Sequence, residues 1–333
     1  MRSMRIILPA IFALLGGVVF AQQPAPLKTI PLQPQAGLAE AYVPQKLASG
    51  ELKLVGSRTM SELAGVWTDG FTHVHRDVKP KFDFQGSATI FDALKADAPI
   101  VGLLSRGLTT ADEEAFAKTA PGKKLIEIDA AFDAIAVVVH KDNPIQGLTF
   151  AQLKTLFGKG PDSLTWDAVG LDGVWDETPV ARFAPGEGAG ARGEFAARVL
   201  GEKGEFGKLS TEDWHTKIVE QVAATKGGIG IVSFANSRSD KVRAVPLAIK
   251  PGVAFTPLSA ETISSGRYPL VRPLSLIVIA DDKGGVKQPL VAEFVRYVLS
   301  SHGQDDVVKD GFSPLPRAVL LKQYDRLGWN SVK

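Results

Sequence analysis

Serine, threonine, glycine and arginine residues gather in four short segments of this chain, and their chemistry suits the capture of an oxyanion. The segments contain Ser57, Arg58 and Thr59; Ser87 and Ala88; Ser105 and Arg106; and Arg182, Ala189, Gly190, Ala191 and Arg192. Hydroxyl and backbone N–H groups donate hydrogen bonds to anions, and a guanidinium contacts two oxygens at once. Each segment follows an apparent strand, so we predict that the four loops meet around one small anion.

The fourth segment, "RFAPGEGAGARGEF", also contains a G-x-G-x-x-G pattern in Gly188, Gly190 and Gly193. The pattern admits three interpretations: a dinucleotide fingerprint, an anion-binding loop or a flexible turn. A dinucleotide site needs an acidic residue roughly 20 positions further on, and Glu212 or Asp213 would serve. The loop lies in the middle of the chain, however, and the context of an exported protein favours the anion-binding loop.

The N-terminus and the composition limit the class of protein. Arg2 and Arg5 precede an apolar run that ends near Ala21, which predicts a signal peptide over residues 1–21. A Gln- and Pro-rich leader over 22–47 is expected to stay outside the fold. The chain has no cysteine, so disulfides and thiolate metal sites are excluded. The net charge is +2, without a Lys/Arg run, and predicts no nucleic-acid partner.

Beyond the leader, short β-like runs alternate with helical patterns, which favours α/β lobes built on mostly parallel sheets. The apolar run over 126–139 is too long for one ordinary strand, and we interpret it as a crossing between two lobes. A second such strand over 274–280 returns the chain. Two lobes joined by two crossings enclose a cleft, where small ligands bind. We expect strands over 51–55, 79–84, 99–104, 178–183 and 228–234, and helices over 61–73, 89–96, 110–119, 149–157, 194–200, 212–224 and 288–300.

These segments resemble the periplasmic phosphate-binding proteins of ABC phosphate importers, from about Glu51 to Pro316. The matching stretches include "GSRTMSELAGVW", "FQGSATIFDAL", "IVGLLSRGLT", "FDAIAVVVHKDNPIQGLTFAQLKTLF" and "SGRYPLVRPLSLIV". The resemblance implies a type II periplasmic-binding-protein fold, in which each lobe is a doubly wound, mostly parallel sheet. We place lobe 1 at 48–131 plus 272–328 and lobe 2 at 132–271.

By position, the resemblance assigns ligand contacts to the first three segments. In the second, Ala88 and Ile90 stand where the family often has a hydroxyl residue and glycine, so we expect a narrower and more apolar mouth there. The fourth segment departs from the family pattern, because Ala189 and Ala191 stand where hydroxyl residues are expected. A hydrogen bond to a charged ligand contributes about 1.5–3 kcal/mol, so the loss of two weakens binding by about 10²-fold or more. The backbone at 188–191 and the Arg58, Arg106, Arg182 and Arg192 guanidiniums remain as donors.

The resemblance implies a monomeric, periplasmic or secreted solute-binding protein without cofactor, metal or catalysis, which delivers phosphate to an ABC permease in the inner membrane. A phosphatase-like enzyme on the same scaffold is one alternative. A diverged sensor or adhesion protein with another ligand is a second. His73 and His75 are the only close histidine pair; their i, i+2 spacing does not suit a helical metal site, and we interpret them as a solvated helix end.

Overall fold

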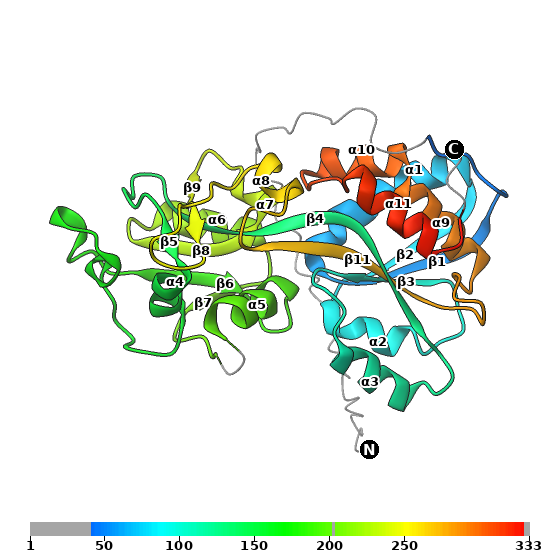
Figure 1. Cartoon of the computed structure of the whole chain (residues 1–333), viewed down its shortest axis with the longest axis horizontal. Helices are drawn as coiled ribbons and strands as arrows, with labels where there is room; N and C mark the ends of the chain where they lie inside the picture. Colours follow the sequence, from blue (N-terminus) through cyan, green and yellow to red (C-terminus); the bar gives the residue numbers. More distant parts are fainter. Residues whose placement is uncertain (1–40, 202–203, 330–333) are drawn as a thin grey trace, which may run out of the picture.

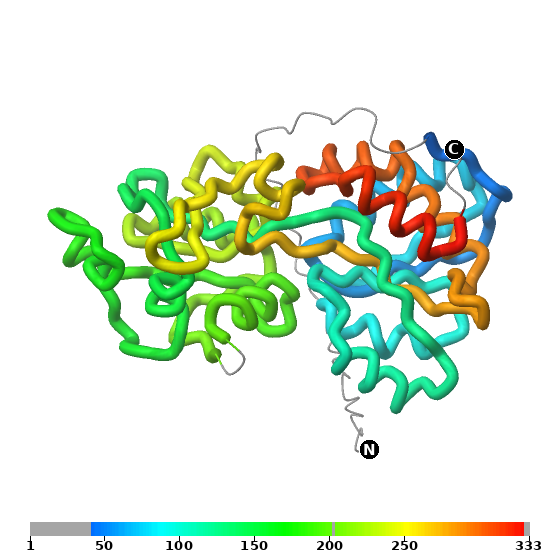
Figure 2. The backbone as a smooth tube through the Cα atoms, viewed as in Figure 1, coloured from blue at the N-terminus to red at the C-terminus, as the bar shows by residue number. Residues whose placement is uncertain are grey.

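The computed structural model describes residues 41–201 and 204–329, so the predicted signal peptide and most of the leader lie outside the described residues. Two α/β bodies lie side by side, and the chain passes between them along two neighbouring strands, β4 and β11 (Figure 1). The tube in Figure 2 follows both crossings, with β4 in green and β11 in orange. The predicted two-lobed architecture is therefore present, and we call the two bodies the first and second lobe.

Helices and strands alternate along the chain, as the sequence pattern predicts. The strands are β1 (Ser49–Gly56), β2 (Asp77–Asp83), β3 (Ile100–Leu104), β4 (Leu125–His140), β5 (Leu148–Thr149), β6 (Ala181–Pro185), β7 (Ser210–Glu212), β8 (Gly228–Ser233), β9 (Val242–Ala244), β10 (Leu247–Ala248) and β11 (Val271–Ile279). The α-helices are α1 (Ser61–Val74), α2 (Ile90–Ala93), α3 (Thr110–Thr119), α4 (Phe150–Phe157), α5 (Gly190–Phe195), α6 (His215–Ala224), α7 (Phe234–Ser237), α8 (Ala260–Ser264), α9 (Pro289–Leu299), α10 (Ser301–Asp310) and α11 (Arg317–Arg326).

The main sheet of the described residues runs in the order β2-β1-β3-β11-β4-β8-β6-β7, with β9 also paired to β4. Strands that stay within one lobe pair in parallel: β1 with β2 and β3, and β6 with β7 and β8. The antiparallel pairs of this sheet all involve a crossing strand. The carboxyl ends of β1, β2, β3 and β6 therefore carry the loops on which most of the predicted anion contacts lie.

Each lobe has its own apolar core, and helices cover both faces of its sheet. Leu52, Trp67 and Phe294 belong to the largest cluster of the first lobe, where α1, α9, α10 and α11 pack on one face. Helices α2 and α3 pack on the other face. In the second lobe, α4 and α5 cover one face and α6 covers the other. Burial on both faces explains why the strands read as continuous apolar runs.

A buried ion pair ties the two crossings together. The Arg272 guanidinium of β11 donates from Nε and Nη2 to Asp133 Oδ2 of β4 at 3.0 and 2.7 Å, and both side chains are 0% exposed. Arg272 also donates from Nη1 to the Ser105 carbonyl at 2.7 Å. Two buried charges are tolerated only when each is paired and hydrogen-bonded, as here. The pair therefore fixes the loop after β3 relative to both crossings.

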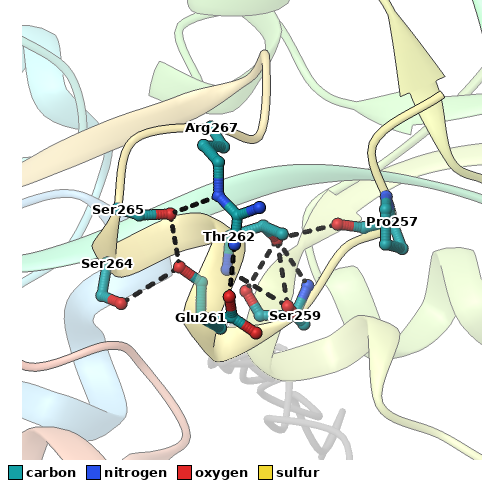
Figure 3. Close-up of polar contacts among 7 residues, drawn as sticks. All are labelled: Pro257, Ser259, Glu261, Thr262, Ser264, Ser265 and Arg267. Atoms are coloured by element: carbon teal, nitrogen blue, oxygen red, sulfur yellow. Dashed lines mark hydrogen bonds and ion pairs between the residues drawn. The ribbon is translucent and has the colours of Figure 1, made fainter. Parts of the chain in front are cut away.

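The turn that leads into β11 is stabilised by a capping box (Figure 3). Ser259 Oγ accepts from the Thr262 N–H at 3.1 Å, and Thr262 Oγ1 accepts from the Ser259 N–H at 3.1 Å. Thr262 Oγ1 also donates to the Pro257 carbonyl, and Arg267 reaches back to Glu261. The capping box satisfies the N–H groups of Ser259 and Thr262 at the start of α8, a few residues ahead of β11.

The end of the leader packs on the first lobe, which differs from our expectation that the leader stays outside the fold. The Tyr42 hydroxyl lies 2.6 Å from His75 Nε2 and donates to Glu293 Oε1 at 2.7 Å. His75 is 1% exposed, and burial lowers its pKa. The interpretation of His73 and His75 as a solvated helix end is therefore wrong for His75, whose Nδ1 accepts from the Ala48 N–H.

Most predicted elements are present, with differences at their ends. Residues 87–89 form a 3-10 turn ahead of a short α2, and residues 196–200 form a π-helical turn after α5. Glu212 ends strand β7 and lies outside α6, because residues 210–212 pair with β6. Helices α10 and α11 are not among the predicted elements. No helix in the described ranges combines the length and the apolar character needed to cross a bilayer.

Candidate functional site

A cleft with mixed polar and apolar walls opens where the loops of the two lobes face each other. Its walls come from residues 57–59 after β1, from Gly86 and Ser87 after β2, from Pro185 at the end of β6 with Gly186 and Ala189 after it, and from residues 213–215 at the start of α6. The empty space measures about 420 Å³, part of it open to solvent. Loops at the carboxyl ends of parallel strands thus form the cleft, in the place where α/β folds bind ligands.

The loop after β1 places Ser57, Arg58 and Thr59 in the cleft. Ser57 caps a 3-10 turn: its Oγ accepts from the Thr59 N–H at 3.2 Å and donates to Ser105 Oγ at 2.8 Å. Gly56 begins this loop with a φ of 133°, and a Cβ there would lie 2.5 Å from the Leu103 carbonyl oxygen. Glycine is therefore required for the loop to pack against β3.

The loop after β2 contributes a hydroxyl that has no partner. Ser87 lines the cleft and is 3% exposed, and its Oγ, which is shut off from solvent, makes no hydrogen bond in the described structure. A buried hydroxyl without a partner costs free energy unless a ligand or water satisfies it. Ala88, in contrast, is exposed and lies outside the cleft lining. Of the two residues predicted in this loop, the structure thus places one at the cleft.

The loop after β3 supports the cleft through its contact with the loop after β1. Ser105 is 0% exposed and interacts with Ser57 and Arg272. Arg106 turns away and donates from both terminal nitrogens to the Asp112 carboxylate, at 2.5 and 2.9 Å. Burial tends to raise the pKa of Asp112, but hydrogen bonds from Arg106 and Thr109 outweigh it and lower the pKa. Arg106 therefore stabilises the start of α3 and is not in the cleft lining.

The loop after β6 approaches the first lobe closely. A Cβ at Gly190 would lie 2.3 Å from Ser105 Oγ, so only glycine permits this contact between the lobes. Ala189 lines the cleft, whereas Ala191 is 0% exposed within the second core. The loop thus contributes its backbone and the methyl group of Ala189 to the cleft, whereas Ala191 packs in the core of the second lobe.

The two arginines predicted for this loop interact elsewhere. Arg182 is 6% exposed and donates to the carbonyls of Leu156 and Asp162 within the second lobe. Arg192 lies over the Phe206 ring, with its Cζ 4.5 Å from the ring centroid, and donates to the Pro185 carbonyl. Neither is in the cleft lining. Sequence position alone did not reveal that backbone carbonyls of the second lobe compete for these guanidiniums.

Three cleft residues, Asp213, Trp214 and His215, were not among the predicted contacts. Arg58 Nη1 lies 3.6 Å from Asp213 Oδ1, and Thr59 Oγ1 lies 3.4 Å from His215 Nε2, so both contacts join the lobes. We expected residues 212–224 to form one helix, so these side chains were not considered as ligand contacts. The signal available was that polar and aromatic residues stand just before α6, at the same edge of the sheet as the other loops.

His215 is neutral in this environment. Burial lowers its pKa to about 3, and the positive charge of Arg272 acts in the same direction. Its Nδ1 is shut off from solvent and has no partner in the described structure. A neutral imidazole has one donor nitrogen and one acceptor nitrogen, so His215 can donate one hydrogen bond to an anion. Within the described residues, no three His, Asp or Glu side chains are grouped to hold a metal ion.

Comparison with known proteins gives a consistent result. A family model for the PBP superfamily domain matches residues 43–302. The chain is 35% identical over 289 residues to the phosphate-binding protein PstS of Pseudomonas aeruginosa, covering 84% of this chain and 88% of that protein. It is 28% identical over 314 residues to protein SphX of Synechococcus elongatus, covering 92% of this chain and 91% of that protein.

Solved structures agree with the curated relatives. One is a putative phosphate ABC transporter substrate-binding protein with bound phosphate from Clostridium perfringens, with a TM-score of 0.63 and 25% identity, covering 80% of this chain and 100% of that chain. Another is a possible phosphate-binding protein from Planctomyces limnophilus, with the same TM-score and identity, covering 84% and 98%. The similarity thus extends over both lobes.

Proposed function

Since this chain belongs to the PBP superfamily and, within it, to the phosphate-binding protein family, we propose that it is an exported solute-binding protein that captures a small oxyanion, inorganic phosphate above all, for an ABC importer. One observation carries the proposal. The buried Ser87 hydroxyl, which lacks a partner, lines a cleft that it shares with the guanidinium of Arg58 and the capped turn at Ser57.

The cleft has the donors that a phosphate needs. Ser87 Oγ and the Thr59 hydroxyl can donate, and Arg58 supplies the positive charge nearest to the site. Arg58 already spans the lobes to Asp213, whose carboxylate is 66% exposed, so an incoming anion competes with a solvated partner. On binding phosphate, Arg58 would give up an exposed ion pair, which contributes little free energy. It would form charge-assisted hydrogen bonds to the ligand in the cleft instead.

Catalysis is not part of the proposal. The Ser57 hydroxyl donates to Ser105, and the nearest imidazole, His215, has a pKa of about 3. A general base with that pKa accepts protons poorly near neutral pH. Neither Ser57 nor Ser105 therefore has a neighbouring base that would activate its hydroxyl as a nucleophile, and we do not favour the phosphatase-like alternative.

The proposal includes several finer points. We expect cleavage after about Ala21, a periplasmic or secreted monomer, and delivery of the ligand to an ABC permease in the inner membrane. The lobe boundaries at 131/132 and 271/272 belong to the same proposal. The two apolar clusters support them: apart from Ala235, the buried residues of one lie within 52–131 and 274–327, and those of the other lie within 134–270.

Isothermal titration calorimetry on the mature protein, residues 22–333, tests the function. We expect saturable 1:1 binding of phosphate and weaker binding of sulfate and molybdate. Absence of heat with phosphate up to millimolar concentration would overturn the proposal. The Ser87→Ala variant removes only the unpartnered hydroxyl. We expect it to bind phosphate more weakly and to keep the melting temperature of the original protein.

A further inference from the structure

The buried ion pair of Arg272 and Asp133 lies where the chain passes between the lobes. The two residues face each other in the pairing of β11 with β4. Along β4, the chain changes core within a few residues: Ala131 belongs to the apolar cluster of the first lobe, and Ala134 to that of the second. The ion pair therefore occupies the boundary between the two cores.

On the side of the first lobe, Arg272 is connected to the loops that form the cleft. Its Nη1 donates to the Ser105 carbonyl, and Ser105 Oγ accepts from Ser57 Oγ at 2.8 Å. Ser57 caps the turn that contains Arg58 and Thr59, and these three residues line the cleft. A continuous set of hydrogen bonds thus joins Arg272 to the cleft wall, although Arg272 is 0% exposed and is not part of the lining.

The same ion pair also contacts the second lobe. Asp133 Oδ1 accepts from the N–H of Phe234, a residue of the second core, at 2.9 Å. Gly190 in the loop after β6 lies against Ser105, where a Cβ would come within 3.1 Å of the carbonyl oxygen that Arg272 holds. One buried pair of charges therefore fixes the segment at which the loops of the two lobes meet.

We propose that Arg272 is a positioning residue for the anion: by holding the Ser105 carbonyl, it keeps Ser57 and its turn in the geometry that binds the ligand. This inference rests on the proposed function. A guanidinium suits the role because its planar fork fixes the directions of its N–H groups, here two toward Asp133 and one toward Ser105. A buried ion pair often stabilises a fold no more than apolar residues of the same volume do, so positioning supplies a reason for charges at this boundary.

A paired substitution in the mature protein separates positioning from stability. Asp133→Asn together with Arg272→Met removes both charges, so no buried charge is left unpaired, and the amide oxygen can still accept from Phe234. We expect a folded protein that binds phosphate about 10-fold more weakly in calorimetry. Arg243→Met, which removes a guanidinium from the Asn143 and Ile145 carbonyls of the second lobe, is the matched control and should bind phosphate as the original protein does. Unchanged affinity in the paired variant would overturn the inference, whereas no phosphate binding by the original protein would remove the proposed function itself.

A double-mutant cycle with Ser57→Ala tests whether Arg272 acts through these hydrogen bonds. Ser57→Ala breaks the link between Ser105 and the turn, so in that background we expect the paired substitution to weaken phosphate binding by less than about 2-fold further. The same loss in both backgrounds would indicate a purely structural or electrostatic effect and would overturn the inference. Ser105→Ala leaves the ion pair intact and serves if the paired variant does not fold. We expect it to bind phosphate about 5-fold more weakly, and unchanged affinity would equally overturn the inference.

Discussion

The loops of the first lobe and the loop after β6 in the second lobe approach the same cleft, but they contribute different chemistry. The first lobe presents side chains: the hydroxyls of Ser57, Thr59 and Ser87 and the guanidinium of Arg58. The loop after β6 presents backbone and the methyl group of Ala189, and its arginines interact with carbonyl groups of their own lobe. The first lobe thus supplies most of the side-chain donors of the cleft, whereas the second lobe adds the backbone near Ala189 and the side chains of Asp213, Trp214 and His215.

The largest expected effect follows from removal of the charge on the first lobe. We expect Arg58→Ala to weaken phosphate binding by about 100-fold, because a charge-assisted hydrogen bond contributes about 1.5–3 kcal/mol. Asp213→Asn, which removes the competing carboxylate, should strengthen binding instead. Calorimetry at one salt concentration measures both. Loss of affinity in both variants would mean that the ion pair matters for structure and that Arg58 does not contact the ligand.

Arg182 of the second lobe should affect stability and leave binding nearly unchanged. Arg182→Met leaves the Leu156 and Asp162 carbonyls without this donor, and we expect a loss of about 1–3 kcal/mol in the free energy of unfolding. Urea denaturation measures the change, and phosphate calorimetry on the folded variant provides the second readout. A specific loss of affinity without loss of stability would restore Arg182 to the ligand site.

A hydroxyl restored to the second lobe should make the two regions more alike. Ala189→Ser adds a donor at the cleft wall, and we expect phosphate to bind about 10-fold more tightly, near the lower end of the value for a hydrogen bond to a charged ligand. Ala197→Ser, at an exposed helical position of the same lobe, is the matched control. Unchanged affinity in Ala189→Ser would indicate that this side chain does not reach the anion.

The stability of the protein should depend on pH through Asp310. Burial raises its pKa to about 7 in the folded protein, above the ordinary value of 3.8, so the folded state binds more protons than the unfolded state between these values. This group therefore contributes a decrease in stability as pH rises from about 4 to 7. Asp310→Asn should flatten that part of the profile. Thermal melts at pH 5 and pH 8 compare the two proteins, and identical slopes would contradict the assignment.

The smallest effect is expected for Arg106 and Arg192. Arg106 pairs with Asp112 and Arg192 stacks on Phe206, so their replacement by alanine should change phosphate affinity by less than about 2-fold. Calorimetry of the two single variants, beside Arg58→Ala, measures this. A loss of 10-fold or more in either would show that these side chains turn into the cleft when the ligand binds.

The fold was predictable because its signals are local. The continuous apolar run in β4, the periodicity of α1 and α9, and the small residues after the strands each depend on neighbours in the sequence. Helices α10 and α11 escaped prediction because their sequences are largely polar and much of their packing is supplied by the first lobe.

The site was predictable only in part, because the direction of a long side chain depends on partners that are distant in sequence. Ser57, Arg58, Thr59, Ser87 and Ala189 lie in the cleft, as their loops indicated. Arg182 lies outside the cleft because its guanidinium donates to the carbonyls of Leu156 and Asp162, which are 26 and 20 residues earlier in the sequence. Trp214 and His215 were missed because residues 212–224 were expected to be helical throughout, whereas Trp214 precedes α6 and His215 begins it.

A crystal structure of the mature protein with phosphate tests the central claim most directly. The account predicts phosphate in the cleft, with oxygens within hydrogen-bond distance of Ser87 Oγ and the Arg58 guanidinium, and with Arg182 and Arg192 still on their backbone carbonyls. Phosphate bound by Arg106, Arg182 or Arg192, with Ser87 still lacking a partner, would contradict it.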